Sequence, residues 1–146
     1  ERLPVVRDSV GEEVHASLFY RDALGQVSRL VDVAAATLRP EFQLLVEQVS
    51  QTLDQVEGEI LVVGHTDSDP IRNNPRFPTN WHLSVERAKA VAAVMEAVLQ
   101  TPGRVQVEGR GADEPIAPNT SREGKALNRR VEVFLKPPPK GLVINN

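Results

Sequence analysis

The chain has 146 residues, of which 40% are hydrophobic and 25% are charged, so it is long enough to bury the core of one soluble domain. Its formal net charge of −3 at pH 7 argues against a general nucleic-acid binder, which needs a basic surface to neutralise phosphates. The absence of cysteine excludes disulfides, thiolate metal sites and cysteine nucleophiles.

The sequence lacks the apolar stretches that mark membrane insertion. No apolar run approaches the roughly 20 residues needed to span a bilayer. No basic, apolar and small-residue signal peptide opens the sequence either. We therefore expect an export signal or a membrane anchor to lie upstream of Glu1.

The first elements in chain order are short strands and then a helix. Residues 1–36 hold apolar residues at near-strand spacing, which predicts at least one strand. A helix follows, because Pro40 suits a first helical turn and apolar residues continue at helical spacing to Val56. Gly58 lies where a C-terminal cap is expected.

A buried strand and a second helix come next. Residues 59–63 form a short, mostly apolar run, typical of a strand buried on both faces. A polar loop with three prolines occupies residues 64–79. The second helix is predicted over residues 80–100, with Asn80 as its N-cap and Pro102-Gly103 as its stop signal.

The last third of the chain predicts two strands around a short helix. Residues 105–108 alternate like a half-buried strand, and so do residues 130–135. A connection rich in glycine, proline and asparagine joins them through a helical segment at 122–128. The order β-α-β-α-β-β predicts an α/β fold, an α+β sandwich with the helices packed on one face of a mixed sheet. We divide the chain into an N-terminal segment 1–36, a main domain 37–136 and a proline-rich tail 137–146.

One charged residue of the second helix falls where an apolar one is expected. At 100° per residue the apolar stripe of this helix contains Arg87 between Leu83 and Val91. A buried guanidinium must reach solvent or meet an anion, because an unpaired buried charge is very costly. Two interpretations stay open: a structural ion pair at the boundary of sheet and helix, or an arginine that binds the carboxylate of a ligand.

A partner for this arginine follows the preceding strand. Asp67 lies just beyond the carboxyl end of the strand at 59–63, where ligands of α/β sheets tend to bind. Together, Asp67 and Arg87 could hold a zwitterion, with an ammonium on the aspartate and a carboxylate on the arginine.

Several motifs over residues 38–136 resemble one family. They are Gly64-His65-Thr66-Asp67, then Asn80-x-x-Leu83-Ser84-x-x-Arg87-Ala88, Gly109-x-Gly111, Pro115, Asn119-Thr120, Gly124 and Asn128-Arg129-Arg130-Val131-Glu132-Val133. In this order and spacing they resemble the OmpA-like peptidoglycan-binding domain.

The resemblance implies a domain that binds the diaminopimelate side chain of peptidoglycan without cutting it. Asp67 would receive the ammonium of diaminopimelate and Arg87 its carboxylate. Thr66, Asn80 and Leu83 would line the same groove. Asn128 and Arg130 would either close the groove or brace Asp67 from beneath.

The loop before the second helix assigns a branch within this family. It is longer than in outer-membrane porin and lipoprotein members, and Ile71 stands where a glycine is common. Residues 81–84 and 108–115 look most like type VI secretion proteins of the TssL kind, and next most like flagellar stator proteins of the MotB kind. The implied partners are peptidoglycan and the subunits of an inner-membrane complex, with the domain in the periplasm and no nucleic-acid partner.

Two other functions remain as alternatives. The first is a protein-interaction scaffold that has kept the fold but no longer binds peptidoglycan. The second is a wall hydrolase or amidase, although no pair of carboxylates suited to acid–base hydrolysis is evident. We predict that the chain is not an enzyme and needs no cofactor. We also predict no metal ion, since His65 is better explained as a residue that stabilises its loop.

Overall fold

The structure, a computed structural model, describes residues 40–71 and 77–136, together with the backbone of six short strands between Val5 and Leu38. Among the described residues, no helix is both long and apolar enough to cross a membrane. The tail predicted at 137–146 lies outside them. The elements in chain order are β1 (Val5–Arg7), β2 (Val14–Leu18), β3 (Tyr20–Arg21), β4 (Val27–Ser28), β5 (Val31–Asp32), β6 (Thr37–Leu38), α1 (Pro40–Leu53), β7 (Glu59–Gly64), α2 (Asn80–Val98), β8 (Val105–Gly109), α3 (Arg122–Asn128) and β9 (Val131–Lys136).

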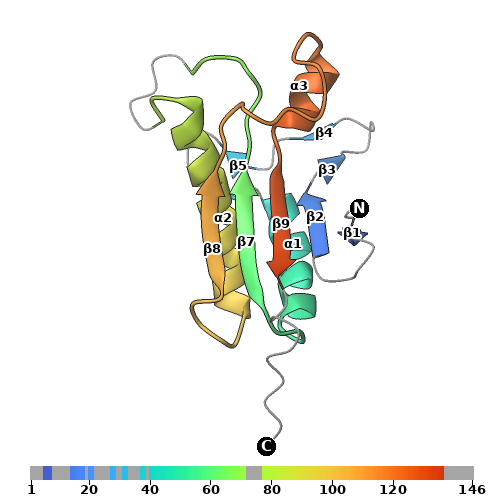
Figure 1. Cartoon of the computed structure of the whole chain (residues 1–146), viewed down its shortest axis with the longest axis vertical. Helices are drawn as coiled ribbons and strands as arrows, with labels where there is room; N and C mark the ends of the chain where they lie inside the picture. Colours follow the sequence, from blue (N-terminus) through green and yellow to red (C-terminus); the bar gives the residue numbers. More distant parts are fainter. Residues whose placement is uncertain are drawn as a thin grey trace, which may run out of the picture.

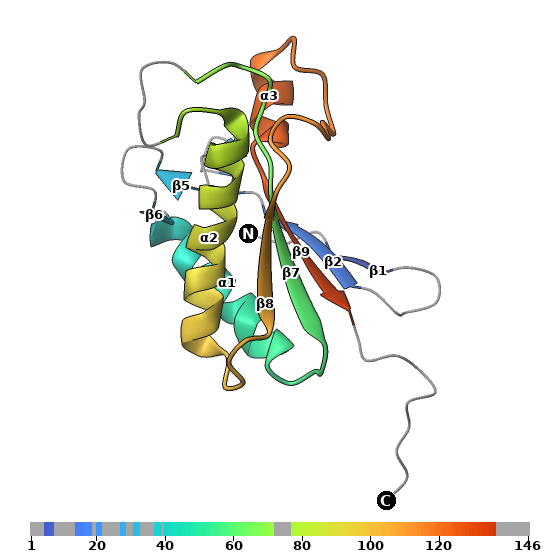
Figure 2. The ribbon, with the colours of Figure 1, turned by 60° about the vertical axis from the view of Figure 1, so that its left-hand side comes forward.

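The main sheet has five strands in the order β1-β2-β9-β7-β8 (Figure 1). Strand β7 pairs in parallel with β8, whereas β9 runs antiparallel to both β7 and β2. Helices α1 and α2 lie together on one face of this sheet (Figure 2). The mixed sheet, the one-sided helices and the strand expected within residues 1–36 are therefore confirmed.

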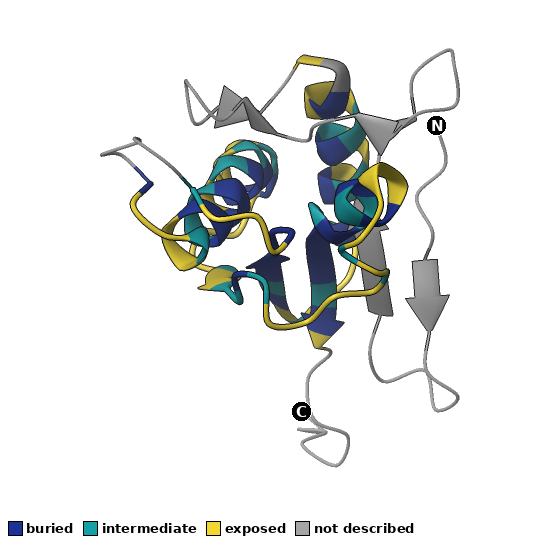
Figure 3. Ribbon diagram, turned by 90° about the horizontal axis from the view of Figure 1, so that it is seen from above, coloured by how far each residue is buried: buried dark blue, intermediate teal, exposed yellow. Residues whose placement is uncertain are grey.

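The core lies between the two long helices and the sheet (Figure 3). Because alternate residues of a strand point to opposite faces, Ile60 and Val62 of β7 share this side with Val133 and Leu135 of β9. Burying one such side chain fully contributes roughly 1.5–3 kcal/mol. The core cluster consists of Phe42, Val46, Leu53, Ile60, Val62, Ala88, Val91, Met95, Leu99, Val131, Val133 and Leu135.

Helix α1 ends earlier than its apolar spacing predicts. It stops at Leu53, and Val56 is 46% exposed, so the cap predicted at Gly58 is wrong. Arg104, which lies just before β8, explains the early end. Its guanidinium donates to the carbonyl oxygens of Leu53 and Gly58, each at 2.9 Å. The first bond engages a carbonyl group in the last turn of α1, which also accepts the backbone N–H of Val56 at 3.2 Å, and the second holds the connection beyond the helix.

The start of α2 and the burial of β8 also differ from the predictions. Thr79, not Asn80, is the N-cap of α2, and its hydroxyl accepts a hydrogen bond from the backbone N–H of His82. Asn80 is thus the first helical residue. Strand β8 is an edge strand whose central residues 106–108 are all exposed, so its predicted half-buried alternation is wrong.

Candidate ligand-binding site

A pocket of about 280 Å³ opens at the carboxyl end of β7. Three elements form its walls: the segment that follows β7, one face of α2 and the C-terminal end of α3. Its volume suits the end of a side chain rather than a whole drug-sized ligand. The lining residues are Thr66, Asp67, Asp69, Ile71, Asn80, Leu83, Arg87 and Arg129.

Helix α2 reaches this pocket because it packs directly on the end of β7. A Cβ atom at Gly64 would lie 1.9 Å from the carbonyl oxygen of Ser84, so only glycine fits. Asn80, Leu83 and Arg87 follow one another at helical spacing on one face of α2. The close contact at Gly64 therefore places this face beside the segment that carries Asp67.

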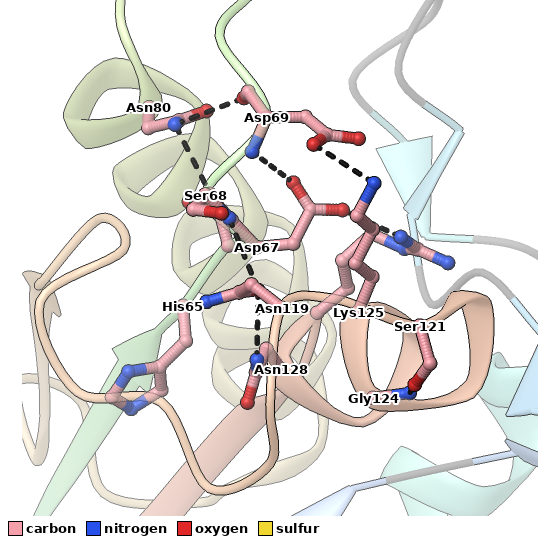
Figure 4. Close-up of polar contacts among 12 residues, drawn as sticks. His65, Asp67, Ser68, Asp69, Asn80, Asn119, Ser121, Gly124, Lys125 and Asn128 are labelled. Atoms are coloured by element: carbon pink, nitrogen blue, oxygen red, sulfur yellow. Dashed lines mark hydrogen bonds and ion pairs between the residues drawn. The ribbon is translucent and has the colours of Figure 1, made fainter.

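Asp67 is buried, and both of its carboxylate oxygens are engaged. Its Oδ2 pairs with Nη1 of Arg129 at 2.5 Å. Its Oδ1 accepts the backbone N–H of Asp69 at 3.0 Å (Figure 4). A carboxylate offers about four lone-pair directions, so Asp67 keeps acceptor capacity for a cation that enters the pocket.

Arg87 is only 3% exposed, and it lines the same pocket as Asp67. Its Nη1 donates to the carbonyl oxygen of His65 at 2.9 Å. A base from α2 and an acid from the segment after β7 thus share one cavity, as the sequence predicts for these two residues.

Asn80 and Thr66 shape the turn that carries Asp67. The Nδ2 of Asn80 donates to the carbonyl oxygens of Asp69 at 3.1 Å and of Asp67 at 3.4 Å. The hydroxyl of Thr66 donates to the carbonyl oxygen of Asp67 at 2.7 Å. Leu83, which is buried, adds an apolar surface to the pocket.

Comparison with known proteins assigns the chain to a family. Residues 32–129 match the OmpA family. The chain belongs to the OmpA family. Its curated relatives include Motility protein B of Bacillus subtilis, 37% identical over 108 residues, which are 73% of this chain and 41% of that protein. Outer membrane protein A of Bordetella avium is 39% identical over 103 residues, 70% of this chain and 50% of that protein. The chain therefore spans half of these relatives or less.

Two solved structures share the fold over most of the chain. The cell wall anchor of the type VI secretion system from Pseudomonas aeruginosa superposes with a TM-score of 0.77 at 36% identity, covering 94% of this chain and 89% of that one. The periplasmic domain of Helicobacter pylori MotB gives a TM-score of 0.78 at 24% identity, covering 97% and 86%. At that identity the second match supports the fold alone. The predicted family and fold are confirmed.

The structure separates the seven predicted site residues of this OmpA-family domain into two groups. Five of them line the pocket: Thr66, Asp67, Asn80, Leu83 and Arg87. Asn128 and Arg130 do not. Asn128 instead holds the loop before α3, with its Oδ1 accepting the N–H groups of Ile116 and Ala117. Its Nδ2 donates to Oδ1 of Asn119, which also accepts the N–H of Ser68 beside Asp67. Asn128 thus lies in the support beneath Asp67.

Arg130 belongs to a buried network behind the pocket. Its Nε donates to Oε2 of Glu132 at 3.1 Å, and Oε1 of Glu132 is 2.9 Å from Nε2 of His65. Burial alone would raise the pKa of Glu132. The hydrogen bond from His65 and the positive charge of Arg130 outweigh that effect, and the pKa of Glu132 falls to about 2.

Sequence reasoning missed three residues of the OmpA-family pocket: Asp69, Ile71 and Arg129. Arg129 pairs with Asp67, while Asp69 pairs with Nζ of Lys125 at 3.1 Å, so two ion pairs join the turn after β7 to α3 (Figure 4). No local pattern of the sequence singles out Arg129, because it is the C-cap residue of α3 and lies before β9 begins at Val131.

Proposed function

We propose that this domain binds peptidoglycan noncovalently, through the diaminopimelate side chain of the stem peptide. Asp67 receives the ammonium of diaminopimelate, and Arg87 receives its carboxylate. The observation that supports this proposal is the presence of both buried, oppositely charged side chains in one pocket of about 280 Å³.

The energetics of such a pocket favour a weak single site. A charge-assisted hydrogen bond contributes roughly 1.5–3 kcal/mol net, so two of them give about 3–6 kcal/mol. This corresponds to a dissociation constant between roughly 5 mM and 0.05 mM. Firm attachment then requires several copies on one assembly, each raising the effective concentration for the next. A membrane complex with repeated subunits meets that requirement.

We further propose that the domain is periplasmic and anchors an inner-membrane complex, in first place a type VI secretion system. Support comes from the secretion-system cell wall anchor, which shares 36% identity with this chain and is covered over 89% of its length. A flagellar stator is the second candidate parent, supported by the 37% identity to Motility protein B of Bacillus subtilis. Under either assignment the proposed binding takes place in the same pocket of this chain, so the binding experiment below applies to both.

Co-sedimentation with purified sacculi that contain diaminopimelate tests the proposal. We expect the wild-type chain to sediment, and Asp67→Asn and Arg87→Gln to stay in solution while keeping a native circular dichroism spectrum. Asp113→Asn and Arg122→Gln are matched controls, because both residues are exposed and lie outside the pocket. They should sediment like the wild type.

Three results would contradict the proposal. Equal retention of the two pocket variants would show that the pocket is not the site. Failure of the wild-type chain to sediment would favour the scaffold function. Release of soluble muropeptides during the incubation would identify a hydrolase.

A further inference from the structure

Three buried polar side chains lie behind the pocket without lining it. They are His65, Arg130 and Glu132, with exposures of 1%, 2% and 7%. They form one chain of contacts, in which Glu132 bridges the guanidinium of Arg130 and the imidazole of His65. The Nη2 of Arg130 also donates to the carbonyl oxygen of Glu114 at 3.0 Å.

This network is an expensive way to fill the interior of a small domain. Burying charges costs several kcal/mol per ion, and apolar side chains of similar volume often give an equally stable or more stable protein. The neighbouring strand positions hold aliphatic side chains. Val131 and Val133 flank Glu132 on β9, and both are buried. What hydrogen-bonded charges add over aliphatic packing is direction, since each contact fixes the orientation of its partner.

The network fixes the orientation of His65. Its imidazole is hydrogen-bonded to Glu132, and its backbone N–H donates to the carbonyl oxygen of Arg130 at 2.9 Å. Its own carbonyl oxygen accepts Nη1 of Arg87 at 2.9 Å. The guanidinium of Arg87, which lines the pocket, is thus oriented by the carbonyl group of His65. Two contacts behind the pocket, described above, hold His65 in place.

Asp67 is oriented by a different set of contacts. Its two oxygens are held by Arg129 and by the backbone N–H of Asp69. Neither of these contacts involves the buried network. The side chains of Asp67 and Arg87 are therefore held by different hydrogen bonds.

We propose that His65, Glu132 and Arg130 are positioning residues for the carboxylate half of the pocket. By fixing the carbonyl group of His65, they aim Arg87 at the carboxylate of the ligand and leave the ammonium half unaffected. The inference rests on the proposed function. Its consequence is that damage to the network removes discrimination between ligands that differ only at this carboxylate, and does not weaken all ligands equally.

Two tripeptides of the stem measure this discrimination: one with free meso-diaminopimelate and one whose diaminopimelate side-chain carboxyl is amidated. Isothermal titration of the whole chain gives the ratio of their dissociation constants. In the wild type we expect the free acid to bind at least tenfold more tightly. In Glu132→Gln the ratio should fall to within about twofold, with the affinity for the amide little changed.

A matched control and a second variant separate positioning from folding. Glu108 is an exposed glutamate on β8 that pairs with Arg110, so Glu108→Gln removes the same kind of contact away from the network and should keep the wild-type ratio. Glu132→Gln leaves the buried Arg130 without its anion and can unfold the chain. Arg130→Met/Glu132→Leu replaces the pair with apolar side chains of similar size, and we expect the same loss of discrimination in this variant.

The outcomes are distinct. A wild-type ratio in a folded network variant would overturn the inference and leave the proposed function intact. A wild-type chain that binds neither peptide, or both equally, would overturn the proposed function and the inference with it. A collapsed ratio with unchanged affinity for the amide supports the positioning role, because general destabilisation would weaken both ligands.

Discussion

The substitution Gly64→Ala tests whether the close contact between β7 and α2 builds the pocket. The new Cβ would lie 1.9 Å from the carbonyl oxygen of Ser84 and 2.8 Å from its carbonyl carbon, both backbone atoms. Ordinary van der Waals contact begins near 3.4 Å, so α2 must retreat by about 1.5 Å. Overpacking of this kind costs about 1–3 kcal/mol. For a chain of this length, that corresponds to a fall in melting temperature of roughly 3–10 °C.

The same retreat carries Leu83 and Arg87 away from Asp67, so the substitution should also weaken ligand binding. Thermal unfolding by circular dichroism and co-sedimentation with sacculi measure the two effects on one preparation. Gly103→Asn is the control, because nothing lies within 4 Å of Gly103 and asparagine tolerates its positive φ of 81°. A melting temperature within 1 °C of the wild type together with unchanged sedimentation of Gly64→Ala would refute the reasoning.

Two further predictions concern stability. Arg104→Ala removes the donors to the last turn of α1 and to Gly58, and should lower the free energy of unfolding in urea by about 1–3 kcal/mol, whereas Arg122→Ala at an exposed position should change it by less than about 0.5 kcal/mol. Because the pKa of Glu132 falls from 4.5 to about 2 on folding, its contribution is complete above pH 4.5 and is lost as the pH falls toward 2. Acid titration followed by tryptophan fluorescence should therefore show a shallower loss of stability between pH 4.5 and 2 in Glu132→Gln than in the wild type, and identical slopes would contradict this origin of the acid sensitivity.

The order of the long elements could be predicted from the sequence because each depends on local periodicity. The structure differs from these predictions where residues distant in the sequence determine the end of a helix or the exposure of a strand. Helix α1 ends at Leu53 because Arg104, about 50 positions along the chain, satisfies its carbonyl group. Thr79 and Asn80 are both good N-cap residues, so propensity alone does not choose between them. The exposure of β8 follows from its place at the edge of the sheet, which depends on strand order rather than on its own residues.

The site could be predicted to the extent that its residues break a local pattern. Arg87 stands out because it occupies an apolar stripe, and Asp67 because it follows the end of a buried strand. Arg129 breaks no such pattern. It is the C-cap residue of α3, and its side chain reaches Asp67 only because α3 folds back over the turn after β7. The ion pair between Asp69 and Lys125 depends on the same docking of α3.

The charges around the pocket account for the choice of a zwitterion in the proposed mode. Two carboxylates, Asp67 and Asp69, face two guanidiniums, Arg87 and Arg129, among the lining residues, so the lining is neutral in sum. An amine alone would approach Asp67 against the charge of Arg129, which already holds that carboxylate. A carboxylate alone would approach Arg87 against the two aspartates. A ligand that carries both charges on one short side chain offsets each repulsion with the opposite attraction. The pocket therefore selects the spacing of the ligand's two charges and not its net charge.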